Sequence, residues 1–186
     1  MTRIVAGRAR GRRLTVPPAG TRPTADRVRE ALVSSLESHL GAFAGLRVLD
    51  LYAGSGALGL EALSRGAAHV LLVESDPKAV RTIEANVAAV GLDGAEVRAA
   101  RAEVVLAGQS SQPYDIVLAD PPYETAGEAV TELLTLLVAG RWLASDALVV
   151  IERGRRAEPL RWPEGLVAGR ERRYGETMLW YGQPAG

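Results

Sequence analysis

The segment Asp120-Pro121-Pro122-Tyr123 combines groups that can hold a planar amino group. Each proline offers a carbonyl acceptor but no N–H donor, and its ring restricts the backbone so that the carbonyl has a defined direction. The Asp120 carboxylate adds an acceptor, and Tyr123 offers a face on which a ring can stack. The segment therefore predicts a turn that accepts both hydrogens of a base amino group and concentrates the lone pair on its nitrogen. The alternative is a rigid loop with a surface tyrosine.

A glycine-rich loop upstream is the second candidate site. Gly54, Gly56 and Gly59 follow the pattern G-x-G-x-x-G after an apolar run, and such glycines let the backbone approach a ligand at a helix N-terminus. Glu74 lies 20 residues after Gly54, where an acid can bond ribose hydroxyls. This pattern fits a nicotinamide or flavin site as well, and it also occurs in turns that bind nothing.

Asp50 distinguishes between these interpretations. Dinucleotide sites usually have an apolar residue at this end of the strand. A carboxylate at this position can instead accept a hydrogen bond, directly or through water, from the ammonium of a methionine moiety. The loop would then approach a cationic ligand that has no pyrophosphate. The sequence therefore favours S-adenosylmethionine as the cofactor.

The elements that must position these groups alternate between strands and helices. Apolar runs predict strands at 46–51, 70–74, 97–100, 115–119 and 147–152. A helix is expected after Pro77, capped by Ser75 or Asp76, and another after Thr125, which has capping-box spacing to Glu128. This alternation predicts a doubly wound α/β sheet with helices on both faces, and both candidate sites then follow strands at its carboxyl edge.

The two ends of the chain depart from this alternation. Residues 4–16 predict a short exposed hairpin, and an amphipathic helix is expected from Thr24 or Asp26 to about Gly41. Segments 166–170 and 177–181 predict a closing antiparallel hairpin. We therefore divide the chain into an appendage at 1–41 and a main domain at 42–186.

Composition limits the classes of function. The 186 residues are 47% apolar and 24% charged, which is typical of a folded domain. Cysteine is absent and the histidines are His39 and His69, so disulfides and thiolate sites are excluded and a metal centre is not expected. No apolar run has the length of a bilayer crossing, and the arginine-rich start differs from a signal core, so the expected location is the cytoplasm.

Charge is distributed unevenly, although the chain is neutral overall. Residues 1–30 carry eight arginines against Asp26 and Glu30, so this segment has a net charge of +6 and the remainder −6. A basic arm on an acidic body is typical of contact with a phosphate backbone, and a solvated surface strand is the plainer alternative.

These motifs together resemble the bacterial RsmD-type family of 16S ribosomal RNA guanine-N2 methyltransferases. The resemblance covers nearly the whole chain, and its most specific part is the segment at 22–32. It extends over Arg3-Ile4-Val5-Ala6-Gly7, Arg10-Gly11-Arg12, Arg22 to Leu32, Asp50 to Ala62, Val73-Glu74, Asp120 to Tyr123 and Arg173-Tyr174-Gly175.

The resemblance implies a class I, Rossmann-like, seven-stranded S-adenosylmethionine-dependent methyltransferase fold with an N-terminal hairpin and helix. It also implies a guanine acceptor in 16S rRNA, within a small-subunit particle, and we expect a monomer. Arg22, Thr24 and Arg27 would lie near the cofactor and the base. The residues expected at the cofactor are Thr24, Asp50, Tyr52, Ala53, Gly54, Ser55, Gly56, Glu74, Ser75, Arg101, Ala102 and Asp120. Those expected at the RNA are Arg8, Arg10, Arg12, Arg13, Arg22, Arg27 and Arg29.

One position departs from the family pattern. Relatives commonly have an acid near the adenine after the third strand, and this chain has Arg101-Ala102-Glu103 there. Either Glu103 takes that place or backbone groups contact the adenine. The other hypotheses that we keep are an adenine-N6 methyltransferase on DNA or RNA, a nicotinamide-dependent oxidoreductase and a non-catalytic RNA-binding module.

Overall fold

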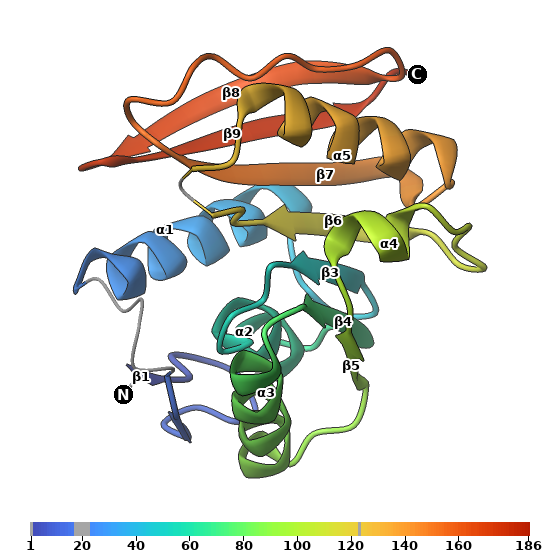
Figure 1. Ribbon diagram of the computed structural model, residues 1–186. Coiled ribbons are helices and arrows are strands. Elements are labelled where there is room, and N and C mark those ends of the chain that lie inside the picture. Colours follow the sequence, from blue (N-terminus) through green and yellow to red (C-terminus); the bar gives the residue numbers. More distant parts are fainter. Residues whose placement is uncertain (1, 17–22, 123) are drawn as a thin grey trace.

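A seven-stranded sheet with helices on both faces forms the body of the protein (Figure 1). The computed structural model describes residues 2–16, 23–122 and 124–186, with the backbone alone for 23–26. The strands of the sheet are β3 (Arg47–Leu51), β4 (His69–Glu74), β5 (Ala95–Ala99), β6 (Tyr114–Ala119), β7 (Leu143–Gly154), β8 (Leu166–Tyr174) and β9 (Thr177–Pro184). The expected seven-stranded α/β fold is confirmed.

The order of the strands places the two candidate sites side by side. The order is β5-β4-β3-β6-β7-β9-β8, in which β3 to β7 run parallel and β9 is antiparallel to both of its neighbours. The chain proceeds outward from β3 to β5 on one side and then returns to β6 on the other. Ligands of such sheets bind at this reversal, outside the carboxyl ends of the strands. The glycine loop follows β3, and Asp120 follows β6, so both lie at the reversal.

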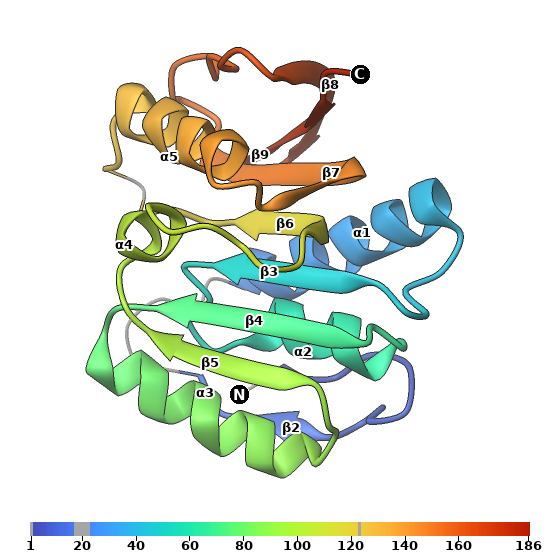
Figure 2. The ribbon, with the colours of Figure 1, turned by 90° about the vertical axis from the view of Figure 1, so that its right-hand side faces the viewer.

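Two apolar layers hold the helices on the sheet (Figure 2). The first layer includes buried residues of α1 (Pro23–Leu40), α2 (Ala57–Ser64) and α3 (Pro77–Val90). The second includes α4 (Ala102–Leu106) and α5 (Gly127–Ala139). Because successive side chains of a strand point to opposite faces, Val48 belongs to the first layer and Leu49 to the second. This alternation lets the central parallel strands β4 and β6 be largely apolar on both sides, whereas the edge strand β5 carries Glu96 and Arg98.

The N-terminal arm packs against the helices that flank the glycine loop. Strands β1 (Thr2–Arg3) and β2 (Arg13–Leu14) form a two-residue antiparallel ladder. Ile4 and Leu14 are buried in the same apolar layer as α2 and α3. The hairpin expected for this arm is therefore present, but the expectation that it is exposed is wrong, because Ile4 and Leu14 pack into the core of the body. The division of the chain at residues 41 and 42 remains a prediction.

The start of each helix tests the capping predictions. Asp76 caps α3, where its carboxylate accepts the N–H groups of Lys78 and Ala79 at 3.2 and 3.3 Å. The cap expected at Thr125 is wrong, because α5 begins at Gly127 after Ala126 and has no side-chain cap. Thr125 instead donates its N–H to the Pro122 carbonyl at 2.9 Å, which closes the turn after β6.

Candidate active site

Asp50 is buried directly beneath the glycine loop. Asp50 is only 4% exposed, and its Oδ2 accepts a hydrogen bond from the Gly59 N–H at 3.0 Å. Burial raises the pKa of the Asp50 carboxyl to about 7, with smaller contributions from the charges of Asp120 and Glu74, while the Gly59 hydrogen bond opposes the shift. A buried carboxyl with such a pKa gains stability from a neighbouring cation.

Gly59 fits its position because of close contact between α2 and the sheet. A Cβ atom on Gly59 would lie 2.6 Å from Leu72 Cδ2 and 2.7 Å from Val70 Cγ1. The first turn of α2 can therefore approach β4 only without a side chain here, and the Asp50 hydrogen bond depends on that approach. This is the packing role that the third glycine has in such loops.

Glu74 joins the glycine loop to the end of β4. Its Oε2 accepts the Gly54 N–H at 2.9 Å, and its Oε1 accepts the N–H groups of Ser75 and Asp76 at 2.7 and 2.9 Å. Both carboxylate oxygens therefore bond to the backbone around the site. The spacing of Gly54 and Glu74 in the sequence corresponds to a direct contact between them.

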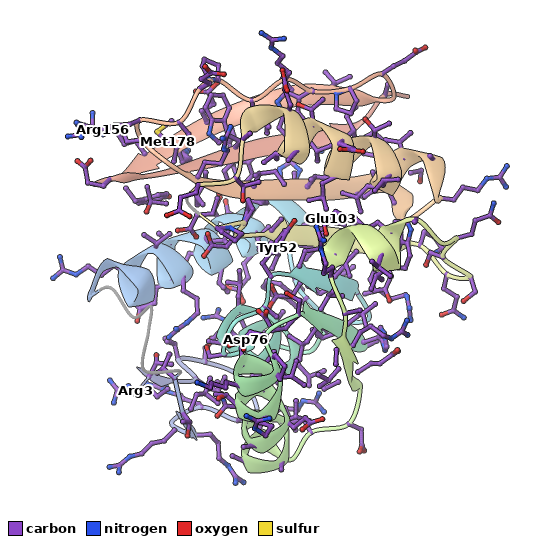
Figure 3. All side chains as sticks on the ribbon, viewed as in Figure 1. Arg3, Tyr52, Asp76, Glu103, Arg156 and Met178 are labelled. Atoms are coloured by element: carbon purple, nitrogen blue, oxygen red, sulfur yellow. The ribbon has the colours of Figure 1, made fainter. Side chains whose placement is uncertain are left out.

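Tyr52 and Glu103 form the wall beyond Glu74, and Figure 3 shows both side chains between β3 and α4. The Tyr52 hydroxyl donates to Glu103 Oε1 at 2.9 Å, and Arg101 Nε lies 3.4 Å from Glu103 Oε2. Burial would raise the pKa of the Glu103 carboxyl, but its own backbone N–H, the Tyr52 hydroxyl and Arg101 together lower it. Glu103 is thus a carboxylate at the edge of the site, while the Ala102 side chain is buried in the core.

The turn after β6 lies across the sheet reversal from the glycine loop. The Asp120 N–H points to the Leu51 carbonyl at 3.5 Å, and Pro121 is buried while Asp120 and Pro122 are exposed. Arg153 of β7 donates to the Thr125 carbonyl at 3.2 Å, which holds the exit of the turn. Asp50 and Asp120 line one small pocket, so the two predicted sites meet.

Several predicted site residues lie outside the described part of the chain. These are Arg22 and Tyr123, together with the side chain of Thr24, which belongs to α1. Tyr123 therefore stays a prediction as a stacking surface.

The described arginines between residues 8 and 29 differ in their contacts and in their exposure. Arg12 and Arg29 bond to the protein itself: Arg12 donates to the Ala89 carbonyl at 3.1 Å, and Arg29 donates to the Thr2 hydroxyl at 2.9 Å and the Arg3 carbonyl at 3.2 Å. Arg8 reaches the Leu63 carbonyl only at 3.5 Å. Arg8, Arg10, Arg12, Arg13 and Arg27 are exposed, and Arg29 is half-buried. Exposure leaves the first five accessible to an anionic partner.

Two buried polar residues that the sequence analysis missed attach the arm. Glu61 of α2 is 1% exposed and accepts the N–H groups of Val5 at 2.8 Å and Ala6 at 3.0 Å, besides pairing with Arg65. Asn86 of α3 is 1% exposed and donates at 2.8 Å to the carbonyls of Thr15 and Ser55. Asn86 thereby connects the arm to the glycine loop. A polar residue on the apolar side of each helix is the only signal for them in the sequence.

The described residues contain neither a membrane-spanning helix nor a cluster of metal-ligating side chains. None of the helices described is long and apolar enough to cross a membrane. Within the same residues, no group of three or more His, Cys, Asp or Glu side chains is placed to hold a metal ion.

Comparison with known proteins gives consistent matches over almost the whole chain. A family described as conserved hypothetical protein 95 matches residues 2–183. The Escherichia coli K12 protein named ribosomal RNA small subunit methyltransferase D is 42% identical over 81% of this chain and 73% of its own length. The Haemophilus influenzae protein of the same name is 34% identical over 93% of this chain and 89% of its own.

Solved structures agree with these matches. The E. coli protein yhhF superposes with a TM-score of 0.86 at 35% identity, covering 98% of this chain and 97% of its own. A magnesium protoporphyrin IX methyltransferase from Synechocystis, solved with bound S-adenosylmethionine, superposes with a TM-score of 0.68 at 15% identity, covering 87% of this chain and 80% of its own. The second likeness concerns the fold alone.

Proposed function

The chain belongs to the RsmD-type family of small-subunit ribosomal RNA methyltransferases, and from that premise we propose that it methylates the exocyclic N2 of a guanine in 16S rRNA. The methyl donor in this proposal is S-adenosylmethionine. The observation that carries it is the pocket shared by Asp50, beneath the glycine loop, and Asp120, of the turn suited to an amino group.

The groups around the glycine loop fit S-adenosylmethionine. Asp50 is a buried carboxyl whose raised pKa makes a cation favourable, and the methionine ammonium is a cation. Glu74 and Glu103 offer carboxylates at the end of β4 and after β5, where ribose and adenine would lie. We assign Tyr52, Ala53, Gly54, Ser55, Gly56, Ser75, Arg101 and Ala102 to the lining of the same site. A nicotinamide cofactor is disfavoured because Asp50 would oppose its pyrophosphate.

The chemistry at the acceptor is a direct transfer. When bound, S-adenosylmethionine would supply an electrophilic methyl carbon and would leave as S-adenosylhomocysteine. Guanine N2 is a weak nucleophile because its lone pair is delocalised into the ring. Asp120 and the Pro121 carbonyl would accept hydrogen bonds from the two amino hydrogens, which directs the lone pair toward the methyl carbon, and Asp120 would take the proton that N2 loses as the new bond forms. Pro122 belongs to the same turn, and Tyr123 would stack on the base.

The arginines between residues 8 and 29 would contact the phosphate backbone. We assign this role to Arg8, Arg10, Arg12, Arg13, Arg22, Arg27 and Arg29, with Arg29 also bonded to the arm itself. Charge neutralisation of this kind makes binding weaken steeply with salt. The proposed substrate is a small-subunit particle, the proposed place of action is the cytoplasm, and the protein would act as a monomer.

One experiment tests this proposal. The purified protein is incubated with labelled S-adenosylmethionine and small subunits that lack the modification, and the labelled nucleoside is identified after digestion. We expect N2-methylguanosine at one position. N6-methyladenosine would refute the guanine assignment and favour the adenine rival.

A variant then assigns the role of the turn. Asp120→Ala should abolish transfer while S-adenosylhomocysteine still binds, and retained turnover would refute the role of Asp120. Asp146→Ala, which changes an exposed aspartate of β7 outside the pocket, is the matched control.

A further inference from the structure

Glu152 lies in β7, beside the turn that contains Asp120. Strands β6 and β7 are paired in register, with Leu118 opposite Val150 and Ala119 opposite Ile151. Asp120 follows the end of β6 directly, and continuing this register by one residue would place it opposite Glu152. Because side chains alternate along a strand, these two residues point to the same face of the sheet as Leu118 and Val150. Two carboxylates, one in the turn after β6 and one in β7, therefore lie at the carboxyl edge of the sheet and line the same pocket.

Both carboxylates line the pocket that also contains Asp50. The remaining walls are mainly apolar and come from α1, α2 and the sheet, including Leu32, Leu58 and Leu179. The space inside is about 20 Å³, which holds about one water molecule. A whole base does not fit in that volume. Its edge can meet the two carboxylates at the mouth, with the amino group at Asp120 and the neighbouring ring atom toward Glu152.

The ring nitrogen N1, next to the amino group, differs between guanine and adenine. In guanine the amino group is adjacent to N1–H, which is a donor. In adenine it is adjacent to N1, which is an acceptor. An ionised glutamate can only accept hydrogen bonds, so it pairs with the edge of guanine and opposes the lone pair of adenine.

We propose that Glu152 is the residue that selects guanine over adenine, by accepting a hydrogen bond from N1–H while Asp120 and the Pro121 carbonyl hold the amino group. This inference rests on the proposed guanine-N2 activity and adds the residue that sets the choice of base. Glu152 takes no proton and forms no bond to the methyl group, so its effect is on specificity. An acceptor that lacks N1–H should therefore react poorly, even where its amino group is present.

The test compares Glu152→Gln with the unaltered protein. A glutamine amide can accept from guanine N1–H and can also donate to adenine N1, so the variant loses the discrimination and keeps the size of the side chain. The substrates are small subunits that lack the modification, with either guanosine or adenosine at the mapped acceptor position. We expect the ratio of adenine to guanine methylation to rise roughly 10- to 100-fold in the variant.

Glu84→Gln is the matched control, because Glu84 is exposed on α3 outside the pocket. It should leave the ratio unchanged. If Glu152 were only structural, Glu152→Gln would lower methylation of both acceptors equally, and an unchanged ratio would therefore overturn the inference. Binding of S-adenosylhomocysteine by each variant verifies that it is folded.

A measurement on the unaltered protein covers the case in which Glu152→Gln does not fold. Subunits reconstituted with 2-aminopurine at the acceptor position retain the amino group but lack N1–H. Methylation should fall roughly 10- to 100-fold relative to guanosine, and equal turnover would overturn the inference. The proposed function fails separately: if the unaltered protein leaves guanosine unmethylated on native subunits, the guanine-N2 assignment is wrong whatever the ratios are.

Discussion

Replacing Asp50 with asparagine should change how the stability of the protein depends on pH. The Asp50 carboxyl has a pKa of about 7 in the folded protein against 3.8 in the unfolded chain. Below pH 3.8 both states are protonated. Between pH 3.8 and about 7 the unfolded chain releases the proton while the folded protein retains it, so the free energy of unfolding falls as pH rises. The stabilisation from the protonated Asp50 carboxyl is complete below pH 3.8 and is lost as the pH rises to about 7.

The magnitude follows from the difference between the two pKa values. Within this window each pH unit lowers the free energy of unfolding by about 1.4 kcal/mol, and the decrease levels off above the pKa of the folded protein. From pH 5 to pH 8 the Asp50 carboxyl should therefore lower the free energy of unfolding by about 2.5 kcal/mol. Asparagine does not titrate, and its carbonyl can still accept the Gly59 N–H. A change in stability that the asparagine amide causes equally at every pH does not affect the comparison, because only the dependence of the free energy of unfolding on pH is compared.

Urea denaturation of both proteins at pH 5, 6, 7 and 8, without ligand, gives the difference directly. The free energy of unfolding of Asp50→Asn, minus that of the unaltered protein, should rise by about 2.5 kcal/mol from pH 5 to pH 8. Saturating S-adenosylhomocysteine should flatten this dependence, because its ammonium would stabilise the Asp50 carboxylate. Parallel curves for the two proteins would refute a raised pKa at Asp50 and, with it, our reason for expecting a cation there.

Three further substitutions test how the site is built. Gly59→Ala should lower the free energy of unfolding by about 1 to 3 kcal/mol, because its Cβ would lie 2.6 Å from Leu72 Cδ2; Gly108→Ala, which meets nothing closer than 3.4 Å, should cost less in the same denaturation assay. Glu61→Ala should cost about 3 kcal/mol, because it removes the acceptor of Val5 and Ala6 and leaves Arg65 with Glu37 alone. The control Glu37→Ala removes the more exposed partner of Arg65 and should cost under about 1 kcal/mol, and equal losses would contradict the role of Glu61. Asn86→Ala should weaken binding of S-adenosylhomocysteine in calorimetry, because Asn86 holds the Ser55 carbonyl of the glycine loop, and an unchanged Kd would refute that role.

The part of the site that could be predicted from the sequence depends on short-range patterns. Gly59, Asp76 and the Gly54–Glu74 spacing each reflect a local requirement: a close approach, a cap and a turn between neighbouring strands. Such requirements appear in a few consecutive residues, so the turn at the glycine loop, the capped α3 and the alternation of strands and helices were predicted correctly, whereas the order of the strands was not predicted. The prediction failed at Thr125, because its N–H bonds to the Pro122 carbonyl in the turn after β6 and α5 begins only at Gly127.

The residues that were missed work through contacts distant in sequence. Glu61 bonds Val5 across 56 positions, and Asn86 bonds Thr15 across 71. Arg153 and Glu152 enter the site only because β7 lies beside β6 in the sheet. Neither has a recognisable spacing from the turn at Asp120, because their distance along the chain is set by the length of α5. Only the strand order and register reveal them.

The arm's attachment also imposes an order in time on the growing chain. Residues 2–16 leave the ribosome before residues 61–89, yet their hydrogen-bond partners include Glu61, Ser64, Asn86 and Ala89. Synthesis must therefore proceed past α3 before the arm can be fixed, although domains generally fold as units from the N-terminus. Until then the most basic stretch of the chain remains without its acidic anchor at Glu61, beside the ribosome that is making it. The arm is thus synthesised before the residues that fix it in place.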